Sequence, residues 1–153
     1  MSMGGPGHGQ TGMFGSIGKT TADGFNPNKY LTHFDYGKVS TLPDGRTLRE
    51  YNITAIEKEI EIAPGVIFPA WTYNGTVPGP TLRCTEGDRV RVYFKNDATH
   101  PHTIHFHGFH PANMDGVFEQ IPPGASYTYE FDADPFGLHL YHCHTIPLKR
   151  HLH

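Results

Sequence analysis

Two stretches, His102-Thr103-Ile104-His105-Phe106-His107 and Leu140-Tyr141-His142-Cys143-His144, decide how this chain is expected to fold. Ten of the twelve histidines lie between residues 100 and 153, and five of them fall in these two stretches. Successive side chains of a strand point to opposite faces. We therefore expect His142 and His144 on one face and Cys143 on the other. This alternation predicts two metal sites, one on each side of a single strand.

Composition limits the classes of protein that fit. The 153 residues are enough for one domain, or one domain plus an extension, with a core that needs no disulfides. The formal net charge of -3 and a sequence pI near 6.4 leave no basic surface for nucleic acid. No apolar run reaches the roughly 18 residues of a membrane helix, so we expect no membrane span. No secretory signal peptide is visible in the sequence.

The N-terminal part differs in character from the rest. Residues 1–28 are rich in glycine and almost without apolar periodicity, so we expect a flexible arm there. The segment that follows, residues 30–46, has the composition of turns, and Leu42-Pro43-Asp44-Gly45 is a clear turn signal. Residues 29–153 are expected to form the domain, with its globular part beginning near Leu48.

From Leu48 onward the pattern is that of β-strands. Short alternating or apolar runs are separated by turns of Gly, Pro and Asn. The expected strands are 51–56, 60–62, 66–73 with an interruption at Pro69, 80–84, 89–94, 103–107, 126–132 and 138–143. This pattern predicts an all-β fold, an antiparallel Greek-key sandwich or barrel. We expect no helix and no internal repeat.

The chemistry of Cys143 favours copper. A cysteine thiolate with two imidazoles, in trigonal array, is the blue-copper arrangement, and these ligands hold copper in both oxidation states. His102 and His151 are the candidate imidazoles, each approaching from a loop at one end of the sandwich. The other cysteine, Cys84, has no disulfide framework to join, and we expect a buried thiol in the strand 80–84.

The opposite face carries imidazoles alone. His105 and His107 come from the earlier stretch, and His142 and His144 from the later one, so neighbouring strands would bring all four together. Four imidazoles are too many for one open catalytic ion and too few to enclose several coppers. The patch is therefore interpreted as half of a site that a second domain completes. Electrons would cross to it from Cys143 through the backbone of residues 142–144.

The chain resembles the cupredoxin domain of the multicopper oxidase family, and most of all the first domain of two-domain, small laccase-like enzymes. The similarity covers roughly residues 28–153, all but the glycine-rich arm. It rests on the segments Tyr73–Leu82, Glu86–Asp88, His102–Gly108, Met114–Gly116 and Leu140–His144. A His-x-His motif alone is weakly specific, but its combination with His-Cys-His at the end of a β domain is strongly specific.

The resemblance implies roles for individual residues. His102, Cys143 and His151 match the ligands of a type 1 copper, and His105 matches a type 2 ligand. The positions that match type 3 ligands are His107, His142 and His144. The chain would thus hold a type 1 copper and a share of a trinuclear type 2/type 3 cluster. Asp115 matches an acidic residue that helps to deliver protons to that cluster.

The resemblance also implies an activity and partners. A reducing substrate, such as a phenol, an aromatic amine or a low-valent metal ion, would be oxidised at type 1 copper, and four electrons would reduce dioxygen to water. Catalysis would need a second cupredoxin domain or a neighbouring subunit, most simply in a homotrimer, in the periplasm or outside the cell. The family continues past the loop of His151 into a closing strand, so the domain is expected to lack that strand or to receive it from a neighbour. The axial copper ligand is therefore not read from the sequence, and Met114 is a weak substitute.

Other functions remain open. Copper nitrite reductases share the fold, but they carry aspartate at the position of His105 and a non-ligand at that of His144, which favours oxygen reduction here. A blue-copper electron carrier, a copper-storage protein or chaperone, and a zinc site are further alternatives. Purely structural roles also remain open: Asp115 as a turn residue, His151 in a solvated tail and Trp71 in the core. Three further histidines are expected at the surface or behind the ligands: His100, His110 and His139.

Overall fold

The computed structural model describes residues 32–63, 65–147 and 151, and the predicted arm 1–28 lies outside them. The described chain forms strands together with a short 3-10 helix, η1, as an all-β fold requires. In order the elements are β1 (Lys38–Thr41), β2 (Thr47–Ala63), β3 (Val66–Tyr73), β4 (Arg89–Asn96), β5 (His105–Phe106), η1 (Ala112–Met114), β6 (Ser126–Asp132) and β7 (Tyr141–His142). No helix within the described ranges has the length and apolar character needed to cross a membrane.

The chain divides into two compact units. One comprises residues 1–34 and 59–70, and its described part includes the end of β2 and the beginning of β3. There the N–H of Gly65 donates to the Glu61 carboxylate at 2.7 Å, which closes the turn between the two strands. The other unit comprises residues 35–58 and 71–153, and all the predicted metal ligands belong to it.

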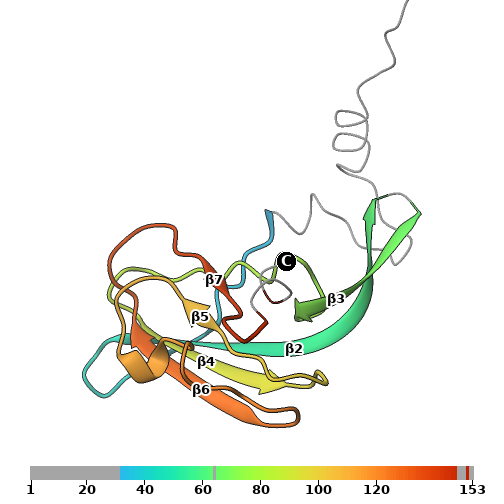
Figure 1. The fold of residues 1–153 in the computed structure, drawn as a ribbon. Coiled ribbons are helices and arrows are strands. Elements are labelled where there is room, and N and C mark those ends of the chain that lie inside the picture. Colours follow the sequence, from blue (N-terminus) through green and yellow to red (C-terminus); the bar gives the residue numbers. More distant parts are fainter. Residues whose placement is uncertain (1–31, 64, 148–150, 152–153) are drawn as a thin grey trace, which may run out of the picture. The chain divides into compact units, whose positions relative to one another are not determined.

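The described strands form two sheets. The larger has the order β1-β2-β4-β6, with β3 also paired to β2, and the smaller consists of β5 and β7. The pairs β1–β2, β4–β6 and β5–β7 are antiparallel, whereas β2 and β4 run parallel. This parallel pair departs from a wholly antiparallel expectation. In Figure 1, β5 and β7 lie over β4 and β6, so the two layers face each other.

The core lies between these two layers and follows the alternation of the sequence. Val92 is fully buried in the middle of β4 and lies opposite Tyr51 of β2 and Tyr129 of β6. From the smaller sheet, the ring of Phe106 contacts Tyr129 and Phe131, with centroids 5.5 and 5.0 Å apart. Apolar side chains from both inner faces therefore pack as they do in a sandwich. This packing fixes β5, and with it the histidine stretch that β5 belongs to.

On its outer face, the larger sheet carries charged side chains across the same strands. Arg91 of β4 pairs with Glu130 of β6 at 2.6 Å and with Glu50 of β2 at 3.4 Å. Arg89 pairs with Asp132 at 2.6 Å. Exposed pairs of this kind contribute little each, but opposite charges on neighbouring strands support the observed register.

Several expectations about the strands were wrong. β1 was not expected, the runs 51–56 and 60–62 form one strand, and Pro69 does not interrupt β3. A proline is tolerated there because β3 pairs only with β2 among the described strands, so a missing N–H need not break a ladder.

The predicted strand 80–84 is not formed, and Cys84 is exposed rather than buried. Instead, Leu82 makes an isolated parallel bridge with Asp35, whose N–H donates to the carbonyl of Thr81 at 2.9 Å. The N–H of Arg83 donates in turn to the carbonyl of Asp35 at 2.7 Å, and Leu82 packs against the core, but Cys84 lies outside this bridge. Alternation alone could not reveal this, because it does not show whether a partner strand exists.

Gly116 offers a test of how tightly the loop after η1 is packed. Its φ is +71°, and a Cβ there would lie 1.8 Å from the carbonyl oxygen of Ile104. Gly124 also has a positive φ, +79°, but nothing lies within 4 Å of its Cβ position. We expect Gly116→Ala to lower the free energy of unfolding by at least about 3 kcal/mol, from backbone strain plus overpacking. Gly124→Ala, which carries strain alone, should cost about 1 kcal/mol.

Urea unfolding followed by the fluorescence of Trp71, the only tryptophan of the sequence, measures both variants. Equal losses would show that the close approach to Ile104 does not constrain the loop.

Candidate metal centres

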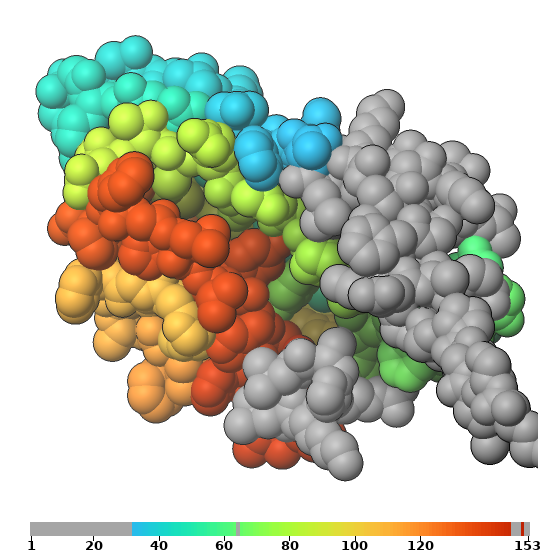
Figure 2. Space-filling model, turned by 90° about the horizontal axis from the view of Figure 1, so that it is seen from above, coloured from blue at the N-terminus to red at the C-terminus, as the bar shows by residue number. Residues whose placement is uncertain are grey.

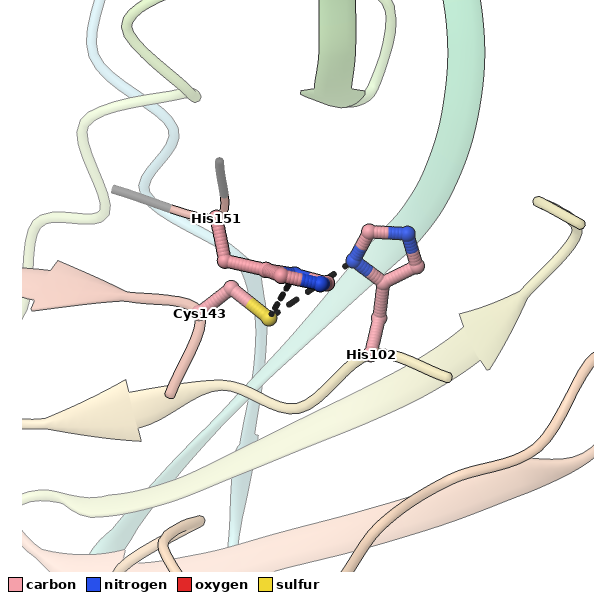
Figure 3. Close-up of side chains that lie close together, drawn as sticks. All are labelled: His102, Cys143 and His151. Carbon is pink, nitrogen blue, oxygen red and sulfur yellow. Dashed lines mark hydrogen bonds between the residues drawn. The ribbon is translucent and has the colours of Figure 1, made fainter. Parts of the chain in front are cut away.

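Cys143, His102 and His151 form a buried cluster (Figure 3). The Sγ of Cys143 lies 3.0 Å from Nδ1 of His151 and 3.6 Å from Nδ1 of His102. The exposed fraction of each residue is small: 4% for Cys143, 3% for His102 and 8% for His151. The structure thus brings together the three residues expected to hold one metal, with two ring nitrogens aimed at one sulfur.

The end of β4 positions His102. Asn96, fully buried, donates from its amide to the carbonyls of His100 and Ile121 at 2.7 and 2.8 Å and accepts the N–H of Ala98 at 3.0 Å. His102 itself pairs with Ile121 through two backbone hydrogen bonds of 3.1 and 3.2 Å. One buried amide therefore fixes the loop that delivers this imidazole.

Two threonines surround the thiol. The backbone N–H of Thr103 donates to Sγ of Cys143 at 3.4 Å, and the thiol lies 3.5 Å from Oγ1 of Thr145. The hydroxyl of Thr103 accepts the N–H of His144 at 3.1 Å, and Tyr73 donates its hydroxyl to the carbonyl of Thr103. The sulfur therefore sits in a polar, hydrogen-bonded setting within the core, which suits a thiolate ligand.

Electrostatics keep His102 in the form that binds metals. Burial, followed by the neighbouring His151 and His100, lowers the pKa of His102 to about 4. The ring is then neutral at physiological pH, as a ligand must be. Its Nε2 is buried without a hydrogen-bond partner in the described part of the chain. One thiolate and two neutral imidazoles make the donor set of a blue-copper site, so the residues fit copper.

The second cluster consists of imidazoles and is more open. One ligand nitrogen each from His105, His107 and His142 lies within 4.8 Å of the others. Nε2 of His107 and Nε2 of His142 are 3.1 Å apart. His144 joins them, with its ring centroid 5.3 Å from that of His105. The four histidines expected on one face therefore gather at one place, and β5 and β7 pair His105 directly with His142.

Backbone carbonyls orient two of these rings. Nδ1 of His105 lies 2.6 Å from the carbonyl of Asp115, and Nδ1 of His142 lies 2.9 Å from that of Cys143. A carbonyl accepts a hydrogen bond from a protonated Nδ1, which leaves Nε2 of each ring as the nitrogen able to bind a metal. Burial, followed by His105 and His142, lowers the pKa of His107. This shift favours the neutral form of His107, which is the form that binds a metal.

Asp115 lies beside this cluster, together with His110. Its Oδ1 is 2.7 Å from Nε2 of His110 and 3.5 Å from Nδ1 of His105. The side chain of His110 is only 3% exposed. It was expected at the surface or behind the ligands, and its close contact with Asp115 places it behind them. Nothing in its local spacing predicted that partner.

The remaining candidates lie in other surroundings. The thioether of Met114 accepts the N–H of Glu130 at 3.2 Å and is thus engaged with β6. His139 is exposed, 2.8 Å from the carbonyl of Pro135. Trp71, expected in the core, is half-buried and contacts three imidazole rings.

Comparison with known proteins shows the family to which the chain belongs. The sequence model of the family described as multicopper oxidase matches residues 55–151. A crystal structure of a multicopper oxidase superposes with a TM-score of 0.83 at 56% sequence identity, over 88% of this chain and 49% of that chain. A copper resistance protein A homolog of Pseudomonas syringae pv. tomato is 41% identical over 108 residues, 67% of this chain and 18% of the relative. The copper-containing nitrite reductase of Neisseria meningitidis is 35% identical over 99 residues, 63% of this chain and 26% of the relative.

The chain belongs to the multicopper oxidase family, and its all-β fold is the cupredoxin fold expected from the sequence. Membership implies that it binds copper. The chain spans 18 to 26% of the length of these two curated relatives and 49% of the crystallised oxidase.

The depressed pKa of His102 has a consequence for stability. An unfolded histidine titrates near 6.5 and the folded one near 4, so the unfolded chain takes up the proton first as pH falls. Stability from this group is complete above pH 6.5 and is lost as pH falls toward 4. In metal-free protein we expect the unfolding free energy to fall over this window by on the order of 2 kcal/mol more than in His102→Gln.

Urea unfolding at several pH values measures the difference between the two proteins. Parallel pH profiles for the wild type and the variant would contradict the effect of burial on His102.

Proposed function

We propose that this chain is a copper-binding domain of a laccase-like multicopper oxidase, which oxidises a reducing substrate and reduces dioxygen to water. His102, Cys143 and His151 bind type 1 copper. The residues that contribute to a trinuclear cluster are His105 as a type 2 ligand and His107, His142 and His144 as type 3 ligands. The observation that carries the proposal is the convergence of ligand nitrogens from His105, His107 and His142 within 4.8 Å.

The buried cluster suits the acceptance of single electrons. Copper held by a thiolate and imidazoles supplies reversible one-electron chemistry. The protein's part is to hold Cys143, His102 and His151 in place and away from water. A cluster already assembled and buried needs little rearrangement when an electron arrives, which is what electron transfer demands of its surroundings.

The two clusters are joined by very short connections. Cys143 is covalently bonded to His142 on one side and to His144 on the other. Thr103 adds a second link, because its N–H bonds to Sγ of Cys143 and its hydroxyl accepts the N–H of His144. Electrons that reach the thiolate therefore have a path of a few bonds to the imidazole cluster.

Oxygen reduction also consumes protons, and the open cluster has an acid–base group beside it. Oδ1 of Asp115 lies 3.5 Å from Nδ1 of His105. We assign the delivery of protons to the carboxylate oxygen Oδ1 of Asp115. His110, 2.7 Å from the same oxygen, holds the carboxylate in place.

A second candidate is nitrite reduction, since copper-containing nitrite reductases are among the relatives. The resemblance places aspartate in those enzymes at the position of His105, and no ligand at that of His144. In this chain His105 lies among the cluster nitrogens and 5.3 Å from the ring of His144. This chain has imidazoles at all four positions, whereas the nitrite reductases would have them at two. The larger set of imidazoles favours reduction of oxygen over reduction of nitrite.

The open cluster implies a partner. His107 is exposed and belongs to an incomplete ligand set, and Leu140, whose carbonyl accepts the N–H of His107 at 2.8 Å, is 65% exposed. We propose that a second cupredoxin domain or a neighbouring subunit, most simply in a homotrimer, completes the cluster. Phenols, aromatic amines or low-valent metal ions are the proposed substrates, and the periplasm or cell exterior the proposed location.

Two substitutions separate the proposed roles. Cys143→Ser removes the thiolate, so the intense visible band of copper-loaded protein should vanish while the four-histidine cluster still binds copper. His107→Ala should keep the band but abolish oxygen uptake, because it removes a ligand from the other cluster. Absorption spectra, copper per chain and an oxygen electrode measure these properties on the full-length protein.

Each alternative gives a different result. A band without any oxygen uptake in the wild type would indicate an electron carrier. Copper binding without the band would indicate storage or delivery of copper. Nitrite turnover in place of oxygen uptake would indicate a nitrite reductase. Any of these outcomes would contradict the oxidase.

A further inference from the structure

Trp71, near the end of β3, contacts three imidazoles at once. Its ring centroid lies 4.5 Å from that of His151 and 5.3 Å, edge-on at 90°, from that of His102. On the third side it lies 4.7 Å from the ring of His100, at an interplanar angle of 38°. The indole therefore touches both imidazoles of the buried cluster and one imidazole outside it.

These imidazoles differ sharply in access to solvent. His102 and His151 are 3% and 8% exposed, whereas the side chain of His100 is 55% exposed. A solute can therefore reach His100 directly. The ring of Trp71 contacts the exposed ring of His100 and also the buried rings of His102 and His151. Electron transfer weakens steeply with distance, so a continuous series of touching rings is a favoured route inward.

The outer end of this series carries a negative charge. The carboxylate of Glu57 accepts the hydroxyl of Thr99 at 2.6 Å and lies 3.2 Å from Nδ1 of His100. Its side chain is 37% exposed. The hydrogen bond from Thr99, followed by that from His100, lowers the pKa of Glu57, despite an opposing effect of burial. A carboxylate beside an exposed aromatic surface matches a cation that carries an aromatic ring.

We propose that cationic aromatic amines dock against Glu57, His100 and Trp71, and that their electrons enter through the Trp71 ring to His102 and His151. This inference rests on the proposed copper site at Cys143. In each step the amine, which already carries one positive charge, loses one electron from its aromatic ring and becomes a radical dication. The electron is taken up by the copper(II) that Cys143 would hold, which becomes copper(I). No bond forms or breaks between the amine and the protein, and dioxygen is the final electron acceptor.

Anaerobic stopped-flow reduction of the copper-loaded, full-length protein tests the route in a single turnover. The probes are a p-phenylenediamine with a quaternary ammonium group and its sulfonated counterpart. Glu57→Gln should slow reduction by the cationic probe about fivefold, the effect of one unit charge at close range in water. It should not slow reduction by the sulfonated probe.

Trp71→Leu should slow reduction by the cationic probe at least about fivefold, and it should slow the sulfonated probe as well. Trp71→Phe, which keeps an aromatic ring, should recover part of the rate. In the wild type the rate with the cationic probe should fall as salt rises, and this dependence should flatten in Glu57→Gln.

Controls separate docking from damage to the site. Asp44→Asn removes an exposed carboxylate on the turn before β2, and Phe118→Leu removes a ring that is 76% exposed. Both controls should react as the wild type does. The visible spectrum and copper per chain should stay unchanged in Glu57→Gln and Trp71→Leu, because neither residue is a ligand. The reduction potential of each variant is measured as well, because groups that contact the ligands can change it, and rates are compared at equal driving force.

Wild-type rates in Glu57→Gln and Trp71→Leu, with an unaltered spectrum, would overturn the route. If Trp71→Leu does not fold, Glu57→Gln and His100→Ala decide the question, since both side chains are exposed. A wild-type protein without the thiolate band would instead contradict the proposed copper function itself.

Discussion

A pair of hydrogen bonds through Thr103 holds the two ligand-bearing segments against each other. Its N–H donates to Sγ of Cys143 at 3.4 Å, and its hydroxyl accepts the N–H of His144 at 3.1 Å. Thr103 is fully buried, so both bonds lie in a medium of low dielectric constant, where they are stronger than in water. They also set the register, because a slip of one residue would turn Cys143 outward and its neighbours into the core. Both clusters depend on this single alignment.

The stretch that carries His102 has little regular sheet structure, yet its backbone donors are paired. The N–H of His102 donates to the carbonyl of Ile121, that of Thr103 to a sulfur, and that of Ile104 to the hydroxyl of Tyr129 at 3.0 Å. Buried N–H groups must find such partners. Side chains here replace a neighbouring strand, and for that reason β5 is only two residues long. The chain is thereby free to place its imidazoles where a straight ladder would not.

The sequence predicted the clusters better than it predicted the elements around them. Alternation within His142-Cys143-His144 is a local property, and it persists even where regular pairing is short. The position of Trp71 depends on how strands and loops distant in sequence meet. His110 and Asp115 are only five residues apart, but their contact depends on the path of the loop between them. The exposure of Cys84 likewise follows from the lack of a partner strand, which no local pattern reveals. The sequence therefore predicted which side chains share a face of a strand, but it did not predict which segments of the folded chain contact one another.

The two clusters also differ in how far this chain alone can complete them. Cys143 and both of its imidazole neighbours are buried within one unit of the chain, so the surroundings of that cluster are already formed. His107, by contrast, is exposed, while His105 and His142 are half-buried. Hydrogen bonds to backbone carbonyls orient the rings of His105 and His142 from within this unit, but nothing in the described chain covers His107. The division follows from strand geometry, since one face of β7 turns to the core and the other away from it. A strand with two such faces therefore carries a buried cluster on one side and a partly exposed cluster on the other.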